Sequence, residues 1–205
     1  MHFIFPANFI YWEKVANHEK IKEQLLPTIL EKQKETEVTP GGWQCKVNTS
    51  FGQDTEFNRF LFQEEIIKEL IWNPMDNMYS QLGDIIPIAE QSMLEDGWYS
   101  VYDNPVDHQE MHHHLSDRFG DGGNYFTSYS AIYLLRLEEE KNSTVFYSRG
   151  PHTGMDPWKS ISYNPADNNP IEEGTVFIFP SHLMHCVNPS PNSRITVSYN
   201  IASKL

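Results

Sequence analysis

Histidines at 112, 114 and 185 have the spacing that could hold a metal ion. Four of the nine histidines fall in DHQEMHHHLSD, residues 107 to 117. Because alternate residues of an extended chain point to the same side, His112 and His114 share one side while His113 points away. His185, in the apolar stretch TVFIFPSHLMH, is the best candidate for a third ligand. Three ligands on one face of an ion leave the opposite face open for substrate and oxygen, as in non-haem iron oxygenases.

The sequence leaves other ligand sets open. His108 and Glu110 form the only His-x-carboxylate pair of this segment, and Asp117 lies three residues beyond His114. Either carboxylate could replace one histidine of the set, because carboxylates also bind iron. A run of histidines can equally be a solvated loop, and a single histidine near a strand end is commonly a hydrogen-bonded core or surface residue. The predicted metal site therefore depends on the combination of the segment with His185.

A second chemical feature is an arginine inside a strand-like alternation. Arg194 follows His185 after the turn-forming stretch CVNPSPNS and begins RITVSYN, in which Arg194 and Thr196 share a polar face opposite an apolar one. The turn allows His185 and Arg194 to point into one cavity. A buried arginine needs an anion, and a small dicarboxylate could bridge the metal and the guanidinium. The alternative is an arginine at a barrel mouth, paired with one of the many acidic residues.

Strands must position these side chains, and the chain changes texture near residue 97. The second half contains short β-branched and aromatic runs separated by Gly, Pro, Asn and Asp, such as WYSVY, SYSAIYLLRL, GTVFIFP and RITVSYNI. This pattern predicts a β jelly roll with helices packed outside it, an α+β fold in one domain. Residues 1–97 form the helix-rich part and residues 98–205 the jelly-roll core. The stretch DRFGDGGNYFT, residues 117–127, predicts a mobile loop between two strands.

The first half shows helical periodicity. Residues 18–35 carry apolar side chains at helical spacing beneath a charged face. These positions are Ile21, Leu25 and Ile29. Pro27 should kink or interrupt this helix. A second helix is predicted over 56–74, ending at Pro74, and a third over part of 85–96.

Composition limits the partners and the compartment. The 205 residues carry a formal net charge of −13, which argues against a nucleic-acid duplex or an anionic membrane as partner. The two cysteines, Cys45 and Cys186, have no metal-like spacing and are predicted to be free thiols in a reducing compartment. The N-terminal MHFIFPANFIYWEK lacks a basic region and meets Pro6 and Glu13 too early for a signal or spanning helix. These features predict a soluble cytoplasmic protein.

Four stretches resemble a known family: VANHEKIKEQLLPTILE, WQCKVNTSF, HQEMHHH and FPSHLMHCVNPSPNSRITVSYNI. On these stretches the sequence resembles the 2-oxoglutarate and iron(II)-dependent oxygenases, in a branch encoded by phages and marine bacteria. The resemblance covers most of the chain, and the last stretch is the most specific. The family commonly reads Q-E-W-H-x-H, so Met111 stands here in place of an aromatic residue.

The resemblance implies a function for each candidate residue. His112, His114 and His185 would bind Fe(2+), and Arg194 with Thr196 would bind the far carboxylate of 2-oxoglutarate. The implied fold is the prolyl-hydroxylase-like double-stranded β-helix. The implied reaction couples decarboxylation of 2-oxoglutarate to succinate with hydroxylation of an unknown substrate by dioxygen, with no catalytic side chain beyond the metal ligands. A phage-encoded protein would act in the host cytoplasm.

One departure from the wider superfamily concerns charge. The superfamily commonly uses His-x-Asp before its distant histidine, whereas His114 occupies the aspartate position here. A neutral set of three histidines leaves the full charge of the ion to be balanced by the cosubstrate.

Two other functions compete with this one. A cupin-like three-histidine metalloenzyme that does not use 2-oxoglutarate would give Arg194 no special ligand. A non-enzymatic jelly-roll interaction module would use its histidines for structural zinc or for no metal. Bound-metal analysis would separate the non-enzymatic function from the other two.

Overall fold

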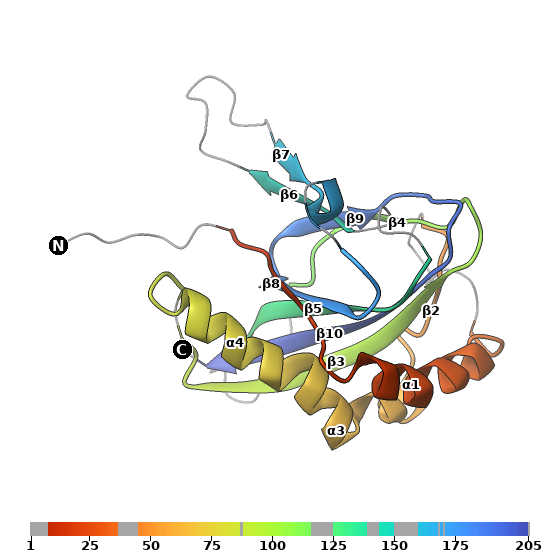
Figure 1. Ribbon diagram of the computed structural model, residues 1–205, viewed down its shortest axis with the longest axis horizontal. Coiled ribbons are helices and arrows are strands. Elements are labelled where there is room, and N and C mark those ends of the chain that lie inside the picture. The colour runs from red at the N-terminus through yellow and green to blue at the C-terminus, as the bar shows by residue number, and fades with distance from the viewer. Residues whose placement is uncertain are drawn as a thin grey trace.

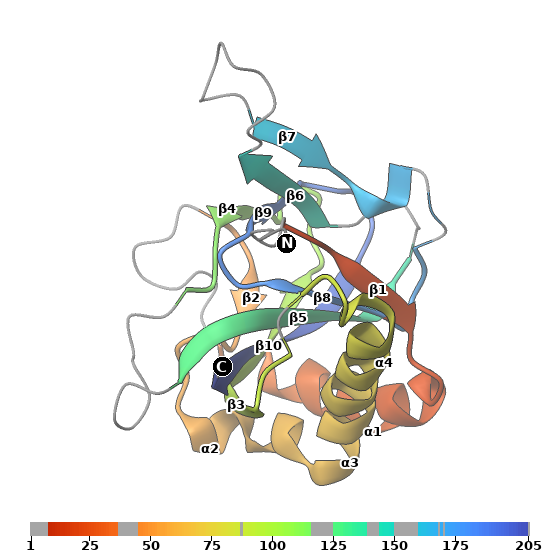
Figure 2. The same ribbon diagram turned by 90° about the vertical axis from the view of Figure 1, so that its left-hand side faces the viewer.

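Two antiparallel sheets and a layer of helices make up the described part of the protein. The computed structural model describes residues 8–36, 45–86, 88–115, 125–138, 144–149, 160–167, 169 and 171–204. The helices cover one face of a six-stranded sheet, and a four-stranded sheet lies over the other face (Figures 1 and 2). This mixture of helices and antiparallel strands confirms the predicted α+β class.

The six-stranded sheet is the larger one, and its central strands are long. Its order is β1 (Tyr11–Lys14), β8 (Thr175–Pro180), β5 (Phe126–Leu137), β10 (Arg194–Lys204), β3 (Gln91–Tyr102) and β2 (Asn48–Thr49). The small sheet has the order β4 (Gln109–His112), β9 (Met184–Val187), β6 (Thr144–Arg149) and β7 (Ser160–Tyr163). A 3-10 turn, Pro165–Asp167, follows β7. The space between the two sheets contains the candidate site.

The first predicted helix is present as α1, His18–Lys32. Its predicted apolar positions are buried against the large sheet, as the helical period indicated. The expected interruption at Pro27 is wrong, because α1 continues through this residue. Tertiary packing of the buried face holds the helix together there despite the hydrogen bond that proline cannot donate.

The second predicted helix is a chain of short segments that extends beyond its expected end. They are α2 (Thr55–Asn58), a 3-10 turn (Arg59–Phe62), α3 (Glu64–Ile67), a π-helical turn (Lys68–Trp72) and α4 (Asn73–Leu82). Pro74 does not end the helix, because it lies in the first turn of α4, where a missing N–H costs little. The π-helical turn just before it widens the helix at the point where the proline enters.

The prediction of a third helix over part of 85–96 is wrong. Residues 91–102 form β3, which pairs with β10 along its whole length. Local propensity is misleading here because pairing with β10 decides the conformation of this segment. Gly97 allows close packing, since a Cβ at this position would lie 2.9 Å from the rings of Phe62 and Tyr199. The region expected to be helix-rich therefore also contains β1, β2 and part of β3.

The two faces of β10 differ in chemistry, as the alternation indicated. On one face, four apolar side chains pack against the helices in the main core: Ile195, Val197, Tyr199 and Ile201. On the other face, four polar side chains point toward the small sheet, and all are buried: Arg194, Thr196, Ser198 and Asn200. A central strand with four buried polar residues in alternation is unusual for a protein core, because buried polar groups need partners. This face forms one wall of the candidate site.

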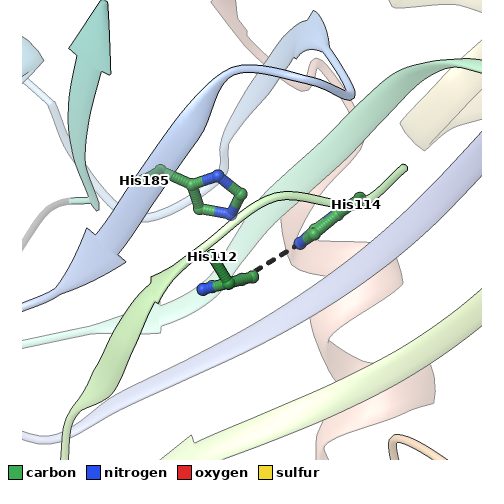
Figure 3. Close-up of side chains that lie close together, drawn as sticks. All are labelled: His112, His114 and His185. Carbon is green, nitrogen blue, oxygen red and sulfur yellow. Dashed lines mark hydrogen bonds between the residues drawn. The ribbon is translucent and has the colours of Figure 1, made fainter. Parts of the chain in front are cut away.

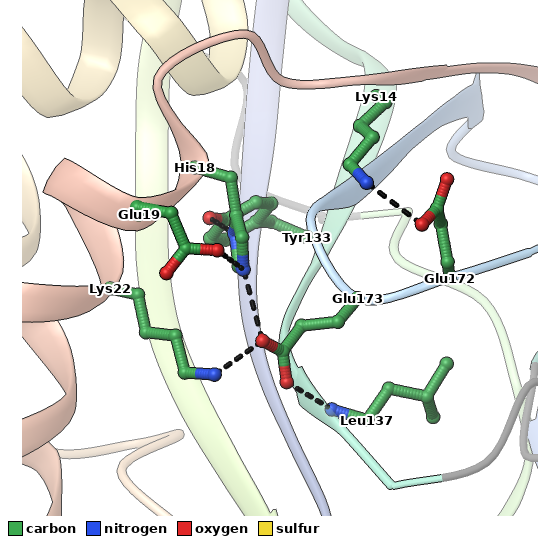
Figure 4. Close-up of polar contacts among 8 residues, drawn as sticks. All are labelled: Lys14, His18, Glu19, Lys22, Tyr133, Leu137, Glu172 and Glu173. Atoms are coloured by element: carbon green, nitrogen blue, oxygen red, sulfur yellow. Dashed lines mark hydrogen bonds and ion pairs between the residues drawn. The ribbon is translucent and has the colours of Figure 1, made fainter.

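On the helix side of the large sheet, a partly buried polar cluster joins α1 to the loop before β8 (Figure 4). The Glu173 carboxylate accepts hydrogen bonds from Lys22 and from the backbone N–H of Leu137, and it lies 3.1 Å from Nε2 of His18. The other ring nitrogen of His18 is hydrogen-bonded to the hydroxyl of Tyr133 at 2.6 Å. Gly174 has φ of +88°, and a Cβ there would lie 2.8 Å from the His18 ring. The cluster therefore fixes α1 against the sheet.

Replacing Glu173 with Gln should lower the free energy of unfolding by about 1–2 kcal/mol at pH 7, because charge-assisted hydrogen bonds are lost. Burial raises the pKa of Glu173, but the bonds from Lys22, His18 and Leu137 outweigh it and hold this pKa below its ordinary value. A lowered folded-state pKa stabilises the protein fully above the ordinary glutamate pKa of about 4.3, and this stabilisation disappears as the pH falls through the folded-state pKa.

Urea denaturation of both proteins should therefore show a difference at pH 7 that narrows below about pH 4.3. Glu172→Gln is the matched control, because its side chain is 53% exposed in a surface ion pair with Lys14. Equal loss of stability in the two variants would contradict the role given to Glu173.

Three further predictions concern the rest of the chain. Most of the predicted mobile loop, residues 117–124, lies outside the described residues, and β5 begins at Phe126. Cys45 and Cys186 are free thiols, as predicted, and both are buried. Within the described ranges, the helices are too short or too polar to cross a membrane.

Candidate metal centre

Three histidines come together between the two sheets (Figure 3). Two of them lie in strands of the small sheet, and the third lies just after one of these strands. His112 is the last residue of β4 and lies opposite His185 of β9, while His114 follows two residues later. One ring nitrogen from each histidine lies within 4.8 Å of the others. The Nε2 atoms of His112 and His114 are 3.2 Å apart. Residues distant in sequence thus present three nitrogen donors to one point.

Main-chain carbonyls orient two of these rings. Nδ1 of His112 donates to the carbonyl oxygen of Glu110 at 2.7 Å, and Nδ1 of His185 donates to that of Leu183 at 3.0 Å. With the proton on Nδ1, each Nε2 carries a lone pair that can bind a metal. Nε2 of His185 is buried and has no hydrogen-bond partner among the described residues. This arrangement matches that of metal-binding histidines, in which the second nitrogen is held by an oxygen acceptor.

Aromatic rings pack against two of the three histidines, His185 and His114. Phe179 and Phe146 lie 4.9 and 5.8 Å from the His185 ring, and Trp98 contacts His114 edge-on at 5.2 Å. Burial in this apolar setting lowers the pKa of His114 to about 3, that of His185 well below 6.5, and that of His112 below 6.5. All three rings are therefore neutral at pH 7, which is the form that binds metals.

The donor set fits a divalent transition metal. Imidazole suits iron, zinc and copper, and nitrogen donors bind zinc at 2.0–2.1 Å. Two such donors at right angles around one ion lie about 3 Å apart, and the His112 and His114 nitrogens are 3.2 Å apart. An ion would also give the buried Nε2 of His185 a partner, which a dry pocket would not.

The rival ligands lie elsewhere or outside the described residues. His113 is exposed, and its Nδ1 accepts the backbone N–H of Leu115 at 3.2 Å. His108 is half-buried, and it donates from Nδ1 to the carbonyl oxygen of Val106. Neither His108 nor Glu110 belongs to a group of three potential ligands in the described ranges. Asp117 is not among the described residues.

Arg194 lies in the same interior, at the start of β10. It is 1% exposed, and Nη2 donates to Oγ1 of Thr144 on β6 at 2.8 Å, so its side chain crosses from the large sheet to the small one. Its guanidinium carbon lies 5.5 Å from the ring centre of Tyr102. Burial lowers the pKa of Arg194, while the Tyr102 phenol raises it. The positive charge of Arg194 also lowers the pKa of His185, so the two groups interact.

Thr196 shares the inner face of β10 with Arg194. It is 2% exposed and lies one alternation further along the strand, opposite Ser100 of β3. Its hydroxyl is on the same wall as the guanidinium, because Ile195 and Val197 face the helices.

Sequence reasoning missed three residues that shape this interior. Tyr102 and Thr144 contact the guanidinium from other strands, and no sequence pattern links them to Arg194. Asn200 could have been found, because the alternation that pairs Arg194 with Thr196 reaches it two steps later.

Comparisons with known proteins give the fold. No protein-family model and no curated protein matches the sequence. Among solved structures, the chain is similar to the viral collagen prolyl hydroxylase of Paramecium bursaria Chlorella virus-1, with 12% identity, 94% of this chain and 96% of that chain covered, and a TM-score of 0.50. The chain has the fold of prolyl hydroxylases and related oxygenases.

Two other structures support this fold. A Pseudomonas putida prolyl-4-hydroxylase is 14% identical over 97% of this chain and 94% of its own, with a TM-score of 0.52. The alpha-ketoglutarate-dependent epimerase SnoN from nogalamycin biosynthesis is 11% identical over 96% of this chain and 78% of its own, with a TM-score of 0.59. The viral hydroxylase was crystallised with 2-oxoglutarate. SnoN and the carbocyclase SnoK, also from nogalamycin biosynthesis, are described as dependent on alpha-ketoglutarate, which is 2-oxoglutarate.

Proposed function

We propose that this protein is an iron(II)- and 2-oxoglutarate-dependent oxygenase with a double-stranded β-helix, a jelly roll that hydroxylates an unknown substrate. The observation that carries this proposal is one interior that contains three neutral imidazoles and a buried arginine. The similar structures include 2-oxoglutarate-dependent enzymes, and the shared fold supports the same assignment.

In this proposal His112, His114 and His185 hold iron(II). The bound ion would supply the oxidation chemistry, coupling decarboxylation of 2-oxoglutarate to succinate with hydroxylation by dioxygen. Carbonyl acceptors fix the proton on Nδ1 of His112 and of His185, so that Nε2 of each faces the ion. Phe146 and Phe179 pack against His185, and Trp98 packs against His114. All three histidines are neutral at pH 7, so none has to lose a net proton to bind the ion.

Arg194 and Thr196 bind the far carboxylate of 2-oxoglutarate. A guanidinium offers two parallel N–H donors that match a carboxylate, and the Thr196 hydroxyl on the same wall adds a third donor. Thr144 and Tyr102 hold the arginine side chain in place. The cosubstrate would then lie between the arginine and the ion, with one end at each.

A neutral ligand set makes the cosubstrate electrostatically important. Three imidazoles contribute no negative charge, so the ion keeps its full double charge beside the Arg194 cation. A dianion such as 2-oxoglutarate offsets two of these three positive charges in a buried site, where unbalanced charge is costly. A monoanionic 2-oxo acid should therefore bind more weakly than 2-oxoglutarate.

Wild-type protein loaded with iron(II) without oxygen should bind 2-oxoglutarate and develop a charge-transfer absorbance as the 2-oxo acid chelates the ion. Adding air should then yield succinate slowly, even without the substrate. A monoanionic 2-oxo acid of similar length is the control ligand. Iron binding with no absorbance change and no succinate would contradict the proposal.

A cupin-like dioxygenase that does not use 2-oxoglutarate is the second candidate. The observation that favours it is the ligand set, because the described group contains three histidines and no carboxylate. The same titration separates the two functions: this candidate would bind iron yet ignore 2-oxoglutarate. A single oxygenase domain over residues 1–205, cytoplasmic localisation and a phage or marine bacterial origin belong to the proposal and stay predictions.

A further inference from the structure

His114 is held differently from the other two histidines. His112 and His185 each donate Nδ1–H to the carbonyl oxygen two residues earlier. Nδ1 of His114 is instead buried and makes no hydrogen bond of ordinary geometry to a described residue. Its backbone N–H donates to the carbonyl oxygen of Ser181 at 2.8 Å, which fixes the main chain but not the ring. Nδ1 of His114 thus lacks the main-chain acceptor that the other two rings have.

The contact between His114 and His112 fixes the position of one proton. Nδ1 of His112 carries its proton because it donates to Glu110, so Nε2 of His112 is an acceptor. The 3.2 Å contact between the two Nε2 atoms then requires His114 to donate from Nε2, which leaves its Nδ1 without a proton. A ring that binds an ion through Nε2 instead carries its lone pair on Nε2 and its proton on Nδ1. Metal binding through Nε2 thus requires the His114 proton to move to Nδ1.

Asn200 is a buried polar side chain whose hydrogen-bond network reaches the His114 segment. It lies on the inner face of β10, is 5% exposed, and its Oδ1 accepts from Oγ of Ser130 at 3.1 Å. Oγ of Ser130 is 2.9 Å from that of Ser181, and neither serine is exposed. Ser181 also holds the His114 main chain, so these contacts link Asn200 to the segment that carries His114. Trp98, whose ring contacts that of His114 edge-on at 5.2 Å, is the strand partner of Ser198, which lies on the same face of β10 as Asn200 and two residues before it.

We propose that Asn200 is the positioning residue of His114, accepting the Nδ1 proton at Oδ1 when Nε2 of His114 binds the ion. This inference rests on the metal centre proposed above. The proton balance is simple: one N–H bond is lost at Nε2 and one is formed at Nδ1 by exchange with water, so the ring stays neutral. Asn200 would accept the Nδ1 proton of His114, as main-chain carbonyl oxygens accept those of His112 and His185.

The first measurement needs no variant. Protein labelled with 15N in its histidines should give NMR signals for His114 with the proton on Nε2 in the metal-free form. After addition of zinc(II), a diamagnetic probe for the site, the proton should be on Nδ1. His112 and His185 should keep the proton on Nδ1 in both forms and serve as internal references. An unchanged His114 proton position on zinc binding would overturn the proposal.

The second measurement is the zinc affinity of three variants, by calorimetry. Asn200→Leu keeps the shape but removes the acceptor, and it should weaken zinc binding about 10- to 100-fold, the usual effect of losing a residue that orients a ligand. Asn200→Asp keeps an acceptor oxygen and should restore affinity to within a few-fold. Asn58→Leu is the matched control, because Asn58 is also 5% exposed but bonds to the Ser50 carbonyl oxygen among other residues.

The outcomes separate this inference from the proposed function. Equal zinc affinity in wild type and Asn200→Leu would overturn the role of Asn200 and leave the metal centre intact. An equal loss in Asn200→Leu and Asn58→Leu would assign the effect to stability alone and also overturn it. Failure of wild-type protein to bind zinc or iron would instead contradict the metal centre.

Discussion

The Arg194→Met variant should lose 2-oxoglutarate affinity by roughly 30-fold to several-thousand-fold, the equivalent of about 2–5 kcal/mol for a buried charged partner. Methionine keeps much of the volume of the arginine stem but removes the charge, so the far carboxylate of the cosubstrate would have no cation at a position where Arg194 is only 1% exposed. The measurement is a titration of 2-oxoglutarate into iron-loaded, oxygen-free protein, followed by charge-transfer absorbance. Iron affinity should stay within about two-fold, because the arginine is not a ligand.

Arg136→Met is the matched control for this variant. Arg136 lies on β5 beside the start of β10, but its guanidinium pairs with Asp103 in a partly exposed ion pair outside the site. Its loss should leave 2-oxoglutarate affinity unchanged. If Arg194→Met binds the cosubstrate as tightly as wild type, Arg194 has no part in that site, and the cupin-like function becomes the better account.

The His185→Ala variant should lose more than about 100-fold in iron(II) affinity, because removal of a direct ligand costs more than removal of a residue that orients one. His185 contributes a buried Nε2 that makes no hydrogen bond to the described residues, so its removal takes away one of three donors. Iron content after dialysis, with isothermal titration for the affinity, measures the effect. Circular dichroism should show that the fold is retained.

His113→Ala is the control for the ligand assignment. His113 belongs to the same histidine run but is exposed, with its ring bonded to the backbone of Leu115. The control should keep wild-type iron affinity. If it loses iron while a His112→Ala variant keeps it, the strand register of this segment is wrong and the pairing of His108 with Glu110 is the better model.

Alternation along β10 could be predicted from the sequence because it is a local property. Arg194 and Thr196 fall on one face and the apolar residues on the other in any regular strand, whatever the partners. The same reasoning placed His112 and His114 on one side. It did not identify Thr144 or Tyr102, because these contacts depend on which strands lie opposite Arg194.

The helical half was predicted less well, for a related reason. The period of α1 is strong, so its buried positions were predicted correctly. Residues 91–96 have no decisive pattern, and pairing with β10 makes them a strand. Pro74 predicts a helix end, yet the helix continues, because the π-helical turn before it accommodates the backbone distortion that a proline causes. Long-range contacts decided both cases, and a local pattern does not contain them.

The position of β10 in the large sheet has a consequence for synthesis on the ribosome. β10 lies between β5 and β3, so without it the order separates into β1-β8-β5 and β3-β2. Its partner Tyr102 is made long before Arg194, and loop closure over such a distance makes the pairing slow. The nascent chain must therefore keep two strand edges apart until residues 194–204 emerge from the exit tunnel. During that interval β3 and β5 present unpaired backbone groups, and such edges readily pair with other chains.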